Sequence, residues 1–291
     1  MSDYFIEKLR IDILKRAMPE GGFASIPKGD YRPDATAWAV LAIDAIGSDT
    51  GLVNDSRTKL ASGQLDDGRV SLSKDKKQAF WPTALAVMAW KDSIQYRKFQ
   101  LRGNDFLLKT KGIHFPKKKE SFTGHDTSIC GWPWIDETHS WVEPTSLVLL
   151  ALEATGNGDH ERAREARRLL LDRQLCYGGW NYGNTTVFGR QLRPMPESTG
   201  LALNALAKRV NRKDVEKSIS YLKQEMNVLK GPLSFSWGFL GLSAWGERPQ
   251  IDEYSLITNY RRRETIGVHR TEELSLLAIC MLSRTGFLGL F

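Results

Sequence analysis

Residues 32–43 read RPDATAWAVLAI, and the same kind of phrase returns along the chain. The other copies are WPTALAVMAW (81–90), EPTSLVLLAL (143–152) and ESTGLALNAL (197–206), with weaker versions in SWGFLGLSAW (236–245) and EELSLLAICML (272–282). Each copy is apolar around most of its helical circumference. A helix of this kind must be buried on all sides. The repeat therefore predicts six buried helices.

Segments of a second kind lie between these copies, and each combines a narrow apolar stripe with charged residues. HERAREARRLLLDRQ at 160–174 shows the pattern best, and the others are 4–18, 56–62, 93–110, 213–226 and 251–263. A narrow stripe indicates a helix with one buried and one solvated face. Six such helices alternating with six buried ones, through short connections, predict an all-α closed barrel. We expect an α6/α6 toroid, with six inner and six outer helices, as one domain over residues 1–291.

The bulk composition is that of a soluble globular protein, with 41% hydrophobic and 26% charged residues in 291. No apolar run reaches the roughly 18–20 residues of a membrane span. The first 18 residues carry charges throughout, which argues against a secretory signal. The three cysteines are widely spaced, so they predict neither a disulfide framework nor a structural zinc cluster. We expect a reducing, cytoplasmic location.

The net charge of +7 is partly local. Lys117, Lys118 and Lys119 form one basic cluster, and Arg261–Arg263 form a second. Such runs usually mark solvated loops or helix ends. The alternatives are contact with an anionic membrane, as a peripheral protein on its inner face, or a pyrophosphate substrate. The chain carries no nucleic-acid-binding motif, so we do not expect nucleic acid as a partner.

Residues 167–183, RRLLLDRQLCYGGWNYG, contain Gln174, Gly178 and Trp180 in the order Gln-x3-Gly-x-Trp. This stretch resembles the QW repeat of the triterpene cyclases. VEPTSLVLLALEATG at 142–156 is similar to the inner helices of the same superfamily, which includes the protein prenyltransferase β-subunits. The resemblance implies a single toroid with a central cavity that opens at one end. It also implies a structural role for Gln174 and Trp180, between an outer helix and the neighbouring helix end.

Asp34 is the first candidate for a catalytic acid. In class II terpene cyclases the signature is Asp-x-Asp-Asp-Thr-Ala, and its middle aspartate protonates an alkene. The matching segment here keeps Asp34, Thr36 and Ala37, but Arg32 and Ala35 replace the two flanking acids. The resemblance implies that Asp34 is the proton donor. The alternative is that Asp34 caps its helix, which is worth roughly 1 kcal/mol.

Glu143 is the second candidate acid. Proline suits the first position of a helix, so Pro144 predicts that Glu143 occupies the cap. Glutamate is a poor cap, which leaves either a partner for the helix dipole or a site residue. In a toroid the inner-helix starts gather at one rim, where we expect an acidic crown. Its members are Asp34, Glu143, Glu197 and Glu272, with His139 and His269 close by in sequence.

Aromatic side chains near the inner-helix starts are candidates for binding substrate. Aromatic faces stabilise a carbocation, although the same residues also suit a packed core. Asp34, Glu143 and His139 are thus the predicted catalytic group. The predicted substrate-binding residues are Trp38, Trp81, Trp141, Tyr182, Glu197, Trp237, His269 and Glu272.

A protein prenyltransferase would need a zinc ion held by Asp, Cys and His. His269 stands near the start of the last inner helix, as the zinc histidine of that family does. Residues 233–237, where the Asp and Cys ligands belong, read LSFSW and offer neither. We therefore expect no metal and no cofactor.

Three functions follow from these patterns. The first is a terpene-cyclase-like protein that acts on or binds a polyisoprenoid, or another apolar small molecule, through acid-initiated cyclisation. The alternative is a non-catalytic toroid for isoprenoid binding or protein interaction, and a prenyltransferase β-subunit-like protein ranks third. One toroid is half of a triterpene cyclase, which makes a second subunit or domain an expected partner. A wide apolar cavity favours the cyclase, whereas a filled centre favours the interaction protein.

Overall fold

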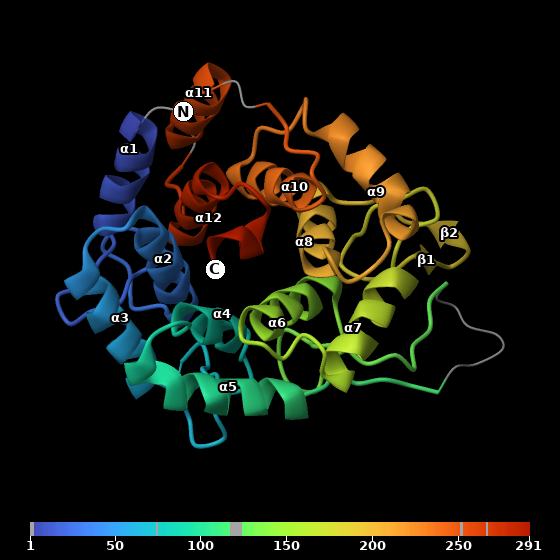
Figure 1. Cartoon of the computed structure of the whole chain (residues 1–291), viewed down its shortest axis with the longest axis horizontal. Coiled ribbons are helices and arrows are strands. Elements are labelled where there is room, and N and C mark those ends of the chain that lie inside the picture. Colours follow the sequence, from blue (N-terminus) through green and yellow to red (C-terminus); the bar gives the residue numbers. More distant parts are fainter. Residues whose placement is uncertain (1–2, 74, 117–123, 251–252, 266) are drawn as a thin grey trace.

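The computed structural model describes residues 3–73, 75–116, 124–250, 253–265 and 267–291. Within these ranges twelve α-helices alternate between an outer and an inner ring (Figure 1). The outer helices are α1 (Asp3–Leu14), α3 (Thr50–Ser62), α5 (Arg97–Lys109), α7 (Glu161–Asp172), α9 (Arg212–Glu225) and α11 (Glu253–Glu264). The inner helices are α2 (Pro33–Ile46), α4 (Pro82–Ala89), α6 (Val142–Ala154), α8 (Pro196–Leu206), α10 (Pro232–Ala244) and α12 (Thr271–Leu282). The predicted all-α toroid is confirmed.

The inner ring is closed. Each inner helix packs against the next one, and α12 packs against α2 to complete the circle (Figure 1). The remaining described elements are two short 3-10 helices, η1 (Ile94–Tyr96) and η2 (Phe287–Leu290), and a small hairpin of β1 (Thr186–Val187) and β2 (Arg190–Gln191). The buried apolar side chains of both rings form one core. No helix in the described part of the chain has the length and apolar character needed to cross a membrane.

Buried threonines fix the starts of the inner helices. Near the starts of five of the six inner helices, α10 being the exception, a threonine hydroxyl bonds to the backbone of a loop beside the inner ring, and these threonines have no exposed surface. The bonds run from Phe23 N to Thr36 Oγ1 (2.9 Å), Val70 N to Thr83 Oγ1 (2.9 Å), Trp132 N to Thr145 Oγ1 (3.0 Å), Trp180 N to Thr199 Oγ1 (2.9 Å) and Thr271 Oγ1 to Ala24 O (2.6 Å). Buried backbone groups need partners, so these hydroxyls hold the loops against the inner ring.

Two expected helix caps are wrong. Helix α2 begins at Pro33, so Arg32 is the cap residue and Asp34 is the second helical residue. Helix α6 begins at Val142, two residues before Pro144, which makes Glu143 the second residue as well. The extension of α6 has a physical reason. The backbone N–H of Val142, which no helical carbonyl can reach, donates to Tyr182 O at 2.9 Å.

Gln174 and Trp180 have structural contacts. The Gln174 side chain donates to Asp214 O (3.1 Å) and to Ser218 Oγ (3.0 Å), which ties the end of α7 to α9. Trp180 is fully buried, and its indole N–H donates to Leu170 O at 2.6 Å. Gln174 therefore joins two outer helices, and Trp180 links α7 of the outer ring to α8 of the inner ring, because its backbone N–H donates to Thr199 Oγ1.

Helices α8 and α10 approach each other through glycines. A Cβ atom added at Gly200 would lie 2.2 Å from Trp237 O, and one added at Gly241 would lie 2.6 Å from Gly200 O. Both distances are far below van der Waals contact. The close contact between these two backbones therefore requires glycine on both helices.

We predict that Gly200→Ala destabilises the protein. Overpacking of this kind costs about 1–3 kcal/mol, which exceeds the gain of up to about 1 kcal/mol from better helix propensity. The control is Gly51→Ala in α3, where an added Cβ meets nothing within 4 Å. Urea unfolding should show a lower midpoint for Gly200→Ala and an unchanged or higher one for Gly51→Ala. Equal midpoints would contradict the glycine contact.

Candidate functional site: an acidic rim on the inner ring

Four carboxyl groups lie on the first turn of inner helices. Each belongs to the second residue of its helix, where the positive end of the helix dipole favours negative charge. We call this set the acidic rim: Asp34 on α2, Glu143 on α6, Glu197 on α8 and Glu272 on α12. Because α12 neighbours α2, and α6 neighbours α8, the rim consists of two adjacent pairs.

The three glutamates of the rim share one hydrogen-bond pattern. Each accepts a hydrogen bond from a serine at the start of the next inner helix or in the loop before it. These bonds are Ser198 Oγ to Glu143 Oε1 (2.9 Å), Ser234 Oγ to Glu197 Oε2 (2.8 Å) and Ser25 Oγ to Glu272 Oε1 and Oε2 (3.1 and 3.0 Å). The sequence analysis missed these serines, although the Glu-Ser dipeptide at 197–198 was a visible signal.

Asp34 forms an ion pair. Arg32 Nε donates to Oδ1 (2.9 Å) and the Arg32 Nη2 atom donates to Oδ2 (2.6 Å), while Trp81 Nε1 lies 3.3 Å from Oδ2. A two-pronged contact with a guanidinium suits an ionised carboxylate. This arrangement argues against Asp34 as a proton donor. Arg32, which replaces a flanking acid of the family signature, is the residue that supplies it.

Glu143 has the opposite environment. Burial raises the pKa of its carboxyl group, the hydrogen bond from Ser198 lowers it, and the neighbouring Glu197 raises it. No ion pair with Glu143 or Glu197 is present in the described ranges. Glu143 is therefore an acid that holds its proton to higher pH than an exposed glutamate does.

Glu272 has a similar environment on the other side of the ring. Burial raises the pKa of its carboxyl group, its own backbone N–H lowers it, and the charge of Asp34 raises it. Arg270 Nη1 lies 3.9 Å from Glu272 Oε1, so this acid has a cation nearby that Glu143 lacks. Of the two acids with raised pKa, only Glu272 has a nearby cation that could offset its negative charge.

Aromatic side chains accompany the rim. Trp81, which contacts Asp34, packs edge-on against Trp134 with ring centroids 6.0 Å apart. Trp141 is the residue before α6 and is partly buried. Tyr182 is half exposed, and burial together with the charges of Glu143 and Glu197 raises the pKa of its hydroxyl group. The charges of Glu143 and Glu197 thus act on Tyr182, and a role of Tyr182 in binding substrate stays a prediction.

The centre of the ring is filled at the level of Trp38 and Trp237. Their rings meet edge-on at 6.0 Å, and Phe287 of η2 packs on them at 5.8 and 5.6 Å. Phe287 is fully buried, and its backbone N–H donates to Asn204 Oδ1 at 2.9 Å. Figure 1 shows the C-terminal end inside the ring. A wide cavity, which the resemblance implied, is thus absent around these described side chains, because the chain's own C-terminal segment occupies it.

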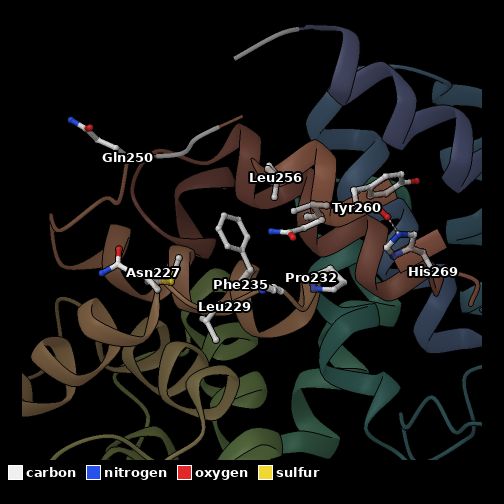
Figure 2. Close-up of a pocket in the computed structure, with 12 residues that line it drawn as sticks. Asn227, Leu229, Pro232, Phe235, Gln250, Leu256, Tyr260 and His269 are labelled. Carbon is white, nitrogen blue, oxygen red and sulfur yellow. Dashed lines mark hydrogen bonds between the residues drawn. The ribbon is translucent and has the colours of Figure 1, made fainter. Parts of the chain in front are cut away.

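The two predicted histidines make their contacts outside the rim. His139 is exposed and packs against Phe115 with ring centroids 5.7 Å apart. His269 is 3% exposed and stacks on Tyr260 of α11 at 4.4 Å. Figure 2 shows His269 Nε2 beside the carbonyl oxygen of Tyr260, at 3.1 Å. His139 therefore packs on Phe115, and a supporting role for it beside Glu143 stays a prediction. His269 lies between the inner and outer rings.

The cavity beside His269 was not predicted. It measures about 350 Å³ and lies where α10, α11 and α12 meet, lined in part by Phe235, Leu256 and Tyr260 (Figure 2). The second basic cluster, Arg261–Arg263, is the last turn of α11, where positive charge complements the helix dipole. The first, Lys117–Lys119, lies outside the described residues. No group of three metal-ligating side chains occurs in the described ranges, and the expectation of no metal stays a prediction.

Comparisons with known proteins identify a fold. No family model and no curated protein matches the chain. A solved structure of a novel α-amylase from Clostridium perfringens is similar, with a TM-score of 0.61, 9% identity, and 97% of this chain and 98% of that chain covered. The type II terpene cyclase MstE from Scytonema, in complex with geranylgeranyl dihydroxybenzoate, is similar with a TM-score of 0.56 and 12% identity, and 94% of this chain and 77% of that chain are covered. A glycoside hydrolase family 76 mannosidase from Bacteroides thetaiotaomicron is similar with a TM-score of 0.53 and 11% identity, and 95% of this chain and 96% of that chain are covered. These similarities support the α/α toroid fold. They do not identify the function, which has to be inferred from the residues of the candidate site.

The raised pKa of Glu143 predicts a pH-dependent stability difference. A raised pKa in the folded state means that the unfolded protein loses this proton first, so stability falls as pH rises above the ordinary value of 4.5. Relative to wild type, Glu143→Gln should therefore gain stability between about pH 4 and 7. Glu247→Gln is the control with the opposite sign, because hydrogen bonds from Lys223 and Arg212 lower the pKa of Glu247. Denaturant unfolding of both variants and of wild type at pH 4 and pH 7 measures the change in stability difference with pH. A change of the same sign in both variants would contradict the raised pKa of Glu143.

Proposed function

We propose that this protein protonates an isoprenoid-like substrate at the acidic rim, with Glu143 as the acid. The observation that carries the proposal is a partly buried carboxyl group with a raised pKa, beside a second carboxyl group and aromatic side chains. An alkene is a very weak base, so its protonation needs an acid that keeps its proton in a water-poor place. Of the four rim acids, Glu143 meets this requirement best.

The proposed chemistry uses residues around α6. The proton of Glu143 moves to one carbon of a double bond, the π bond supplies the electron pair, and the adjacent carbon becomes cationic. Trp141 and Tyr182 offer aromatic faces to that cation. Loss of a proton from the cation to a rim carboxylate, such as Glu197, forms a new double bond and ends the reaction. Asp34, held by Arg32, contributes negative charge to the opposite side of the ring.

The fold comparison supports this proposal only at the level of architecture. The terpene cyclase MstE was solved with geranylgeranyl dihydroxybenzoate, so an α/α toroid of this kind can enclose an isoprenoid chain. The filled centre of the present ring restricts a substrate to the rim, unless Phe287 moves. We therefore propose a short isoprenoid, or the end of a longer one, as the substrate.

The filled centre favours a second candidate, a toroid that binds an isoprenoid or a protein partner without converting it. Phe287 occupies the space that a cyclase keeps for its substrate, and the hydrogen bonds from the serines satisfy the rim glutamates without any ligand. Under this proposal the rim carboxyls stabilise contacts between neighbouring inner helices. A second subunit, or a membrane contact through the exposed Arg261 and Arg262, would then supply the biological context.

An assay with three proteins separates these functions. Wild type, Glu143→Gln and Asp34→Asn are incubated with isoprenoids of several lengths, and products are identified by mass spectrometry. We expect turnover by wild type and a loss of about 10²–10⁴-fold in Glu143→Gln, the usual cost of removing a general acid. Asp34→Asn should retain most activity if Asp34 is not the donor.

The outcomes that contradict the proposal are distinct. Binding without conversion by wild type would leave the non-catalytic toroid. Activity lost only in Asp34→Asn would return the donor role to that residue. Short oligosaccharides serve as comparison substrates, because an α-amylase and a mannosidase share the fold. If wild type hydrolyses these oligosaccharides, the proposed substrate class is a sugar and not an isoprenoid.

A further inference from the structure

A second, smaller cavity lies between the 124–131 segment, the start of α6 and the end of α7. Its volume is about 150 Å³. Its polar lining residues are His125, Thr127, His139, Ser140, Arg173 and Asn184. Trp141 lines it as well, so the cavity adjoins the acidic rim. None of these residues has a role in the chemistry proposed above, except for Trp141.

Arg173 brings a buried positive charge to this cavity. It is 7% exposed and follows directly after α7. One of its nitrogens, Nη1, donates to Gly183 O at 2.8 Å. Its Nε atom has no hydrogen-bond partner among the described residues, because the nearest carboxyl oxygen, Asp172 Oδ2, is 3.6 Å away. That oxygen instead accepts a hydrogen bond from the backbone N–H of Asp126, at 2.8 Å.

The energetic state of Arg173 is unfavourable without a ligand. Burial lowers the pKa of its guanidinium to about 10, against the opposing effects of Asp172 and Asp126. A buried charged donor that lacks an acceptor loses its hydration without full compensation. An anion in the cavity would offer the guanidinium a further acceptor and would add negative charge to that of Asp172 and Asp126.

His125 is a second and independent unpartnered group. It is 9% exposed, and its Nδ1 atom has no hydrogen-bond partner in the described part of the chain. Burial, followed by the charge of Arg173, lowers the pKa of its imidazole to about 4. The ring is therefore neutral near pH 7 and has one N–H, which can be placed on Nδ1 as a donor.

We propose that this cavity binds a phosphoryl group, with Arg173 and His125 as its principal donors. Two buried side chains, each with one nitrogen that lacks a hydrogen-bond partner among the described residues, line one small space. A guanidinium also matches the geometry of phosphate oxygens. The hydroxyl groups of Thr127 and Ser140 and the amide of Asn184 line the same space and can contact the remaining oxygens. The group is either free phosphate or the head of an isoprenoid phosphate, whose hydrocarbon chain would then extend past Trp141 to the rim.

Calorimetric titration of the full-length protein with inorganic phosphate, and separately with geranyl phosphate, tests this site. Arg173→Gln and His125→Gln each remove a charge-assisted or buried hydrogen bond worth about 1.5–3 kcal/mol, so affinity should fall about ten- to hundred-fold. The matched control is Arg167→Gln. Arg167 is equally buried on α7, but its guanidinium donates to Gly158 O and does not line the cavity.

The results separate the two ligand sources and the two proposals. Similar affinities for both ligands indicate a free-anion site, whereas much tighter binding of geranyl phosphate indicates a head-group site. No phosphate binding by wild type, or binding that survives both Arg173→Gln and His125→Gln, overturns the inference. If Arg173→Gln fails to fold, His125→Gln decides. The Glu143 assay is run with isoprenoids that carry no phosphate as well as with isoprenoid phosphates, so a failure of the phosphate site leaves the result with phosphate-free substrates unaffected.

Discussion

The buried threonine hydroxyls at the inner-helix starts are the contacts on which the rest of the structure depends. Each one satisfies a backbone group of the loop that arrives from the outer ring, in a place that water does not reach. Repetition of this contact around the ring aligns the inner helices at their first turns. A carboxyl group at the second position of four of these helices must then fall on the same rim. The candidate site is thus a consequence of the repeat.

The chemistry of the rim arises from differences among its equivalent positions. Asp34 has a guanidinium partner, whereas Glu143 has a serine, a neighbouring carboxyl group and little solvent. One position on the repeat therefore has a carboxyl group in an ion pair with a guanidinium, and at another position burial raises the pKa of the carboxyl group. Pairs of carboxyl groups in such contrasting environments are a common basis for acid–base function. The filled centre limits where that function can operate, because Trp38, Trp237 and Phe287 leave the rim as the accessible part of the ring.

Periodicity predicted the helices, the two rings and the placement of the rim acids, because each depends on a pattern that recurs in every repeat. Features outside the repeat escaped prediction. Phe287, which fills the centre of the ring, belongs to the C-terminal segment that follows the last repeated helix. His269 is near the rim in sequence, but its ring stacks on Tyr260 of an outer helix. Helix α6 begins earlier in the chain than predicted, because the carbonyl oxygen of Tyr182, from a loop distant in sequence, accepts a hydrogen bond from the backbone N–H of Val142. Long-range partners of this kind leave no local signal.

The ionisation of Glu143 is the central claim, and infrared difference spectroscopy measures it most directly. The spectrum of wild type minus that of Glu143→Gln isolates the carbonyl stretch of a protonated carboxylic acid at this one position. We predict that this band persists above pH 4.5, the ordinary pKa of glutamate, because burial raises the pKa of Glu143. A band that is lost at or below pH 4.5 would contradict this prediction, because the pKa of Glu143 would then not be raised.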